Sequence, residues 1–98
     1  MENTVWDFAA SGNGAAKVIT PRLPMQALVS GTIGGGTVTF EVLHNGSYIP
    51  AKDSAGNTVS ITAVGVYGGF RASQGETIRS VLTGATTPTL RVELREVV

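Results

Sequence analysis

The sequence predicts an all-β fold, an antiparallel β-sandwich of jelly-roll-like type with about eight short strands. The first observation is composition: the 98 residues include twelve Val, five Ile and twelve Thr, and β-branched side chains favour strands over helices. The second is the alternation of apolar and polar residues, and the third is the Gly, Pro and Asn clusters between the alternating runs. No window of roughly eleven residues has a helical period free of Gly and Pro, so no helix of any length is expected.

Alternation is clearest in two runs. In residues 37–42 (TVTFEV), Val38, Phe40 and Val42 share one face, and polar side chains occupy the other. Residues 90–95 (LRVELR) repeat this pattern with a charged outer face. Because successive side chains of a strand point to opposite faces, each run predicts a strand with one buried face.

Turn residues divide the rest of the chain. Asn45-Gly46 tolerates the positive φ angles of a type I′ turn, so residues 37–43 and 47–52 are expected to form a hairpin. A second turn at 53–57 leads into a strand at 58–64. The other strands are expected at residues 4–9, 16–20, 25–30, 76–83 and 89–97.

Length and charge limit the function. Residues 1–98 are expected to form one domain. A formal net charge of zero argues against nucleic acid as a partner, and no apolar run is long enough for a membrane span. The N-terminus carries acids and lacks the apolar segment of a signal peptide, so the protein is expected to be made in the cytoplasm and not secreted.

The charged fraction is the more informative number. It is 14%, against about 25% for an average soluble domain. Few charges give weak protection against association. Two interpretations remain open: a surface largely covered by partners, and a Thr/Ser/Gly-rich surface that stays soluble by itself.

The residues provide no recognisable catalytic, cofactor or metal site. The single histidine, His44, adjoins the Asn45-Gly46 turn and has no carboxylate at ligand spacing, so we expect an exposed turn residue. The glycine clusters at 12–14 and 34–36 precede strand-like runs, whereas a phosphate-binding loop precedes a helix. With no cysteine in the chain, disulfides and thiolate metal sites are excluded. We therefore expect no enzymatic activity.

The aromatic residues are the candidates for binding. Trp6 and Phe8 are two positions apart and precede the Gly/Ser-containing linker 11–14. Residues 1–14 therefore fit two alternative structures. In one, a first strand buries both rings in its own sandwich; in the other, an arm or edge strand lays them on a neighbouring subunit. Tyr48 and Tyr67 are expected at strand margins, where a ring could stack on a ligand. The uncharged terminus Val97-Val98 is a second predicted subunit contact.

The order of features resembles small β-sandwich virion proteins of tailed bacteriophages. The resemblance covers about three quarters of the chain and rests on residues 28–43 (LVSGTIGGGTVTFEVL), 46–50 (GSYIP), 65–67 (GVY) and 78–84 (IRSVLTG). The chain departs from the family pattern at 71–75, where it reads RASQG in place of a segment with Leu-Pro-Ala-Gly.

The resemblance implies a virion structural protein, preferably a capsid decoration (cement) protein that acts by oligomeric adhesion. Its implied partners are the major capsid protein, or another virion protein, and further copies of itself, for which a trimer is the expected state. The implied location is the virion, in the head, a head fibre or the tail. The alternative is a carbohydrate-binding module, or a tail- or fibre-associated adhesion domain, with Tyr48, Tyr67 or Trp6 as the stacking platform.

Overall fold

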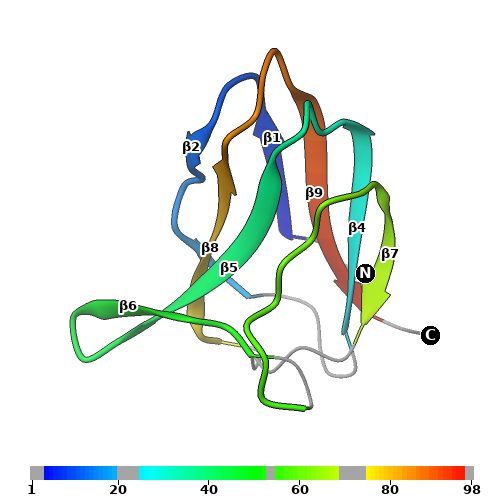
Figure 1. Ribbon diagram of the computed structural model, residues 1–98. Coiled ribbons are helices and arrows are strands. Elements are labelled where there is room, and N and C mark those ends of the chain that lie inside the picture. Colours follow the sequence, from blue (N-terminus) through cyan, green and yellow to red (C-terminus); the bar gives the residue numbers. More distant parts are fainter. Residues whose placement is uncertain (1–3, 20–24, 53–54, 69–74, 97–98) are drawn as a thin grey trace.

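The computed structural model describes residues 4–19, 25–52, 55–68 and 75–96 (Figure 1). These residues form nine β-strands and no helix, and hence no helical segment that could cross a membrane. The strands are β1 (Thr4–Phe8), β2 (Gly12–Asn13), β3 (Lys17–Val18), β4 (Met25–Thr32), β5 (Thr37–His44), β6 (Ser47–Pro50), β7 (Gly65–Gly68), β8 (Thr77–Thr83) and β9 (Thr89–Glu96).

The strands form two antiparallel sheets. Sheet A has the order β1-β9-β4-β7, and sheet B has the order β2-β8-β5-β6, with β3 also paired to β8. Since β2 and β3 both pair with β8, they act as two halves of one interrupted strand. If β2 and β3 are counted as one strand and the strands are renumbered 1 to 8 along the chain, sheet A has the order 1-8-3-6 and sheet B has the order 2-7-4-5. This is the arrangement of a jelly roll. The predicted all-β, jelly-roll-like sandwich is confirmed.

The alternating residues fill the space between the sheets. Val38 and Phe40 of β5 are fully buried, and Phe40 is paired with the buried Ser80 of β8. Sheet A contributes alternate residues of β9 and β4, among them Val92 and Val29, which pair with each other. Burying one face of each sheet against the other accounts for the two-residue period of the sequence.

The predicted hairpin is also present. β5 and β6 pair from Glu41↔Pro50 to His44↔Ser47, which leaves a two-residue loop. The φ angles are 51° at Asn45 and 79° at Gly46. Positive φ at both central residues is the signature of the type I′ turn, whose twist matches that of the strands.

The predicted strand at 58–64 is wrong. There the structure has isolated bridges at Thr58 and Ile61, and the strand that follows is β7. Ile61 exchanges two backbone hydrogen bonds with Val38 of sheet B, with N···O distances of 2.8 and 2.9 Å, whereas β7 pairs with β4 of sheet A. The chain crosses between the sheets in this segment, so it cannot pair continuously along either one.

One glycine illustrates how closely the strands approach one another. Gly31 of β4 has φ +95°, and a Cβ atom built there would lie 2.1 Å from the backbone oxygen of Thr89. Gly84, in the turn before β9, has φ +69°, but a Cβ atom built at Gly84 would have open space around it. Thr87 in that turn also has a positive φ, 45°, which is costly for a β-branched residue.

Candidate functional site

Trp6 and Phe8 belong to the core of their own sandwich. They lie on β1, at an edge of sheet A, and pair with Val92 and Leu90 of β9. Trp6 is 3% exposed and Phe8 is 8% exposed. The Trp6 indole Nε1 donates a 2.7 Å hydrogen bond to the backbone oxygen of Ala15. The interpretation of these rings as anchors on a neighbouring subunit is therefore wrong, because strand alternation turns both rings inward, although the segment is an edge strand.

The predicted subunit contact at the C-terminus and the predicted stacking residue Tyr67 have different outcomes. Val97 and Val98 lie outside the described residues, so their role as a subunit contact stays a prediction. Tyr67 lies on β7 and packs against the core, and its hydroxyl donates a 2.7 Å hydrogen bond to the backbone oxygen of Ala63. Its ring is thus part of the sandwich wall and is a poor stacking platform.

Tyr48 is half-buried and lies on the outer face of sheet B, so the structure does not bring it together with Tyr67. The guanidinium carbon of Arg79 lies 3.8 Å from the centroid of the Tyr48 ring, a cation–π contact. One face of the ring is therefore occupied within the chain.

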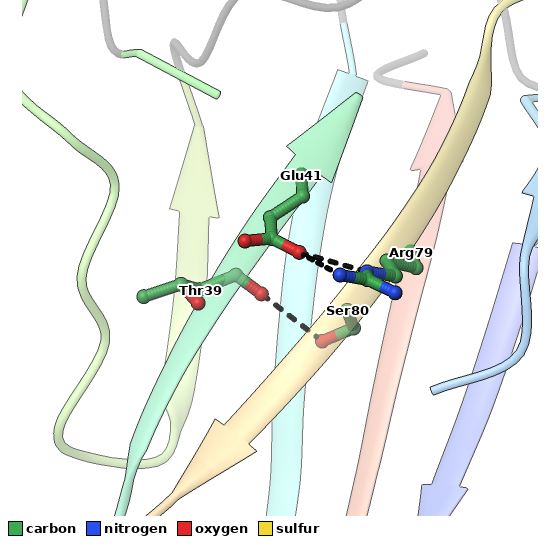
Figure 2. A network of polar contacts seen from close by, with 4 residues as sticks. All are labelled: Thr39, Glu41, Arg79 and Ser80. Carbon is green, nitrogen blue, oxygen red and sulfur yellow. Dashed lines mark hydrogen bonds and ion pairs between the residues drawn. The ribbon is translucent and has the colours of Figure 1, made fainter. Parts of the chain in front are cut away.

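Arg79 also forms an ion pair with a carboxylate. Glu41 and Arg79 are paired across β5 and β8, and the guanidinium reaches Glu41 Oε1 from both Nε and Nη2 at 2.7 Å (Figure 2). The side chains are 29% and 24% exposed, respectively. In the same view, the Ser80 hydroxyl is directed toward the backbone oxygen of Thr39 at 3.4 Å. Glu41, Arg79 and Tyr48 form a connected group that joins the base of the hairpin to β8.

The end of the β5–β6 hairpin extends beyond the sheet. β8 pairs with β5 only as far as Val42, so the next two residues of β5, Leu43 and His44, are paired in the described part of the chain with β6 alone. Figure 1 shows this hairpin projecting from the sandwich. We refer to residues 43–49 as the hairpin end.

The hairpin end is apolar on both faces and carries no formal charge. Leu43 is 38% exposed and pairs with Tyr48 on the outer face, whereas Ile49 is 46% exposed and pairs with Val42 on the opposite face. The sequence contains a signal for this feature: Val42-Leu43 and Tyr48-Ile49 are consecutive apolar pairs that break the alternation beside a turn. Leu43 and Ile49 were not among the predicted site residues.

Two other features lie on the surface of the described residues. Val64, just before the sheet A edge strand β7, is 50% exposed, and Val66, within β7, is 58% exposed. An open hollow of about 310 Å³ lies where β1, β9 and β4 meet. Its wall includes the exposed ion pair of Arg91 Nε with Asp7 Oδ1, 3.2 Å apart. The two charges neutralise each other, so the hollow has no net charge from this pair to select a ligand.

The described residues contain no cluster of three His, Cys, Asp or Glu side chains that could hold a metal ion. His44 is exposed at the hairpin turn, with its Nε2 3.3 Å from the Asn45 side-chain nitrogen. In comparisons with known proteins, no family model, no curated protein and no solved structure matches this chain.

Proposed function

We propose that this chain is a structural protein of a phage virion, a capsid decoration protein that assembles as a homo-oligomer, a trimer, and adheres to the major capsid protein. The jelly roll supports the proposal, since viral capsid domains use this fold. Because one fold serves many functions, the stronger support comes from the surface.

The hairpin end is the observation that carries the proposal. It presents Leu43 and Ile49 to solvent on a two-stranded projection, with no formally charged group among residues 42–51. The fully buried core of a protein interface is more apolar than the rest of the surface and is depleted in charged residues. The contact with Arg79 of β8 holds the Tyr48 side chain of the hairpin end in place, which lowers the conformational entropy lost on binding.

Multivalency makes a small contact sufficient. A single hairpin end is too small for a stable interface of standard size, which buries roughly 1,600 Å². In an oligomer, however, several hairpin ends bind the same particle at once, and the effective concentration raises the overall affinity. The proposal therefore requires both self-association and adhesion.

A pair of matched double variants tests the proposal. Leu43→Ser/Ile49→Ser removes the apolar side chains of the hairpin end, and Val64→Ser/Val66→Ser removes two exposed valines at the edge of sheet A. We expect the unmodified chain to form a stable oligomer by light scattering and to co-sediment with capsids assembled from the major capsid protein of the same genome. The hairpin variant should lose about tenfold or more in capsid affinity, and the valine variant should not.

The proposal is overturned by a monomer that does not bind these capsids, or by equal binding of both variants. A monomer that binds a glycan array would instead identify a carbohydrate-binding module. Far-UV circular dichroism of each variant confirms that the sandwich is intact, because both pairs of positions are exposed.

A further inference from the structure

The geometry points to Asn45 as a site of spontaneous deamidation, in which the backbone nitrogen of Gly46 attacks the side-chain amide of Asn45. A bond forms between this nitrogen and Asn45 Cγ, and the amide nitrogen leaves as ammonia with the proton of the attacking N–H. Water then opens the cyclic imide at either carbonyl to give aspartate or isoaspartate. Overall, one water is consumed and one ammonia is released, with no oxidation or reduction.

The attacking nitrogen is accessible. Both Asn45 and Gly46 are exposed, and the space around a Cβ position at Gly46 is empty to 4 Å. In the register His44↔Ser47, Gly46 is a central residue of the two-residue loop, so its N–H lies outside the ladder of strand hydrogen bonds. Because Leu43 and His44 are paired with β6 alone among the described strands, opening the turn breaks no pairing with β8.

His44 lies beside the leaving group. Its Nε2 is 3.3 Å from Asn45 Nδ2, the nitrogen that departs as ammonia. An imidazole at this distance can transfer a proton to the departing nitrogen or accept one from it. His44 is the one histidine of the chain, so its contribution can be measured with a single substitution.

The chain contains its own control, the dipeptide Asn13-Gly14. The Gly14 N–H donates a 2.7 Å hydrogen bond to the backbone oxygen of Ser80. A Cβ atom at Gly14 would lie 2.6 Å from the Trp6 ring, so this glycine is closely packed against the core. Attack on Asn13 requires that the hydrogen bond first breaks and that this packing opens. The native fold therefore protects one Asn-Gly pair and leaves the other reactive.

Deamidation changes the hairpin end in two ways. It places a negative charge on a segment without formal charge, and isoaspartate adds a methylene group to the main chain within the turn. The added group is incompatible with the two-residue loop that sets the His44↔Ser47 register. A loss of capsid adhesion on ageing is expected from this change, and that consequence alone rests on the proposed function.

Peptide mapping by mass spectrometry tests the site in the full chain. After incubation in mildly alkaline buffer, we expect a gain of about 1 Da at Asn45. It should accumulate at least about tenfold faster than at Asn13, which corresponds to an opening cost of about 1.4 kcal/mol at Asn13. In denaturant, the two sites should react at similar rates. Equal rates in the folded protein, or no conversion at Asn45, would overturn the inference.

Two variants extend this test. His44→Gln should slow conversion at Asn45 without affecting the denatured control, and an unchanged rate would overturn the role of His44. Asn45→Asp places the charge at the turn from the start. If Asn45 deamidates but both the aged protein and Asn45→Asp bind capsids normally, then the modification stands and its link to the proposed function fails.

Discussion

Replacing Trp6 with alanine separates a core residue from a subunit anchor. The indole is 3% exposed. Its ring centroid lies 6.2 Å from that of Phe40, with an interplanar angle of 59°, the tilted arrangement that aromatic pairs prefer. Its Nε1 also satisfies the Ala15 carbonyl at 2.7 Å. If these contacts hold the sandwich together, the variant loses stability whether or not a partner is present.

The magnitude follows from the burial of the indole. Truncation of a buried tryptophan to alanine costs about 3–5 kcal/mol, and the lost hydrogen bond is part of that figure. A domain of this size has a total stability of about 5–15 kcal/mol, so Trp6→Ala removes a large share of it. Trp6→Phe keeps an aromatic ring next to Phe40 but lacks the donor to Ala15, and we expect a loss of about 1–2 kcal/mol.

Chemical denaturation followed by far-UV circular dichroism measures both losses by linear extrapolation. Fluorescence is unsuitable because Trp6 is the only tryptophan. A loss below about 1 kcal/mol for Trp6→Ala, with an unchanged denaturant slope, would refute the core assignment and restore the anchor interpretation. Deletion of residues 1–10 would not test an adhesive arm, because it removes strand β1 from sheet A and so destabilises the sandwich itself.

Five further substitutions test local features by their effect on the free energy of unfolding. Gly31→Ala should cost at least about 2 kcal/mol, and Gly84→Ala about 1 kcal/mol, because both have positive φ but only the first meets a backbone oxygen. Equal losses would contradict this distinction. Arg79→Lys should cost about 1 kcal/mol, since lysine lacks the planar fork, whereas Arg91→Lys, in a more exposed pair, should stay within about 0.5 kcal/mol. Thr87→Asn should stabilise by about 0.5–1 kcal/mol and raise Tm by several degrees; an unchanged Tm would show that this φ angle carries no strain.

Much of the fold was predictable because its signals are local. Alternation around Phe40 assigns the faces of β5, since side-chain direction in a strand depends only on position along it. Asn45-Gly46 predicts the hairpin because these residues tolerate the φ angles the turn requires. The 58–64 prediction fails although its residues alternate, because the partner of a strand is not encoded in its own pattern: Ile61 bonds to Val38 while β7 joins β4.

The candidate site required the tertiary structure. The sequence by itself determined an uncharged apolar segment around a turn. It did not determine that the pairing of β8 with β5 stops at Val42 and leaves Leu43 projecting. The sequence also contains two Asn-Gly pairs. Their different reactivity depends on the packing of Gly14 against Trp6 and on the hydrogen bond from Gly14 to Ser80, which only the tertiary structure provides. Likewise, only the pairing of Trp6 with β9 shows that its ring is buried in the core and is not a surface residue. Burial and exposure depend on which distant strands become neighbours, so they are decided only when the two sheets have closed on each other.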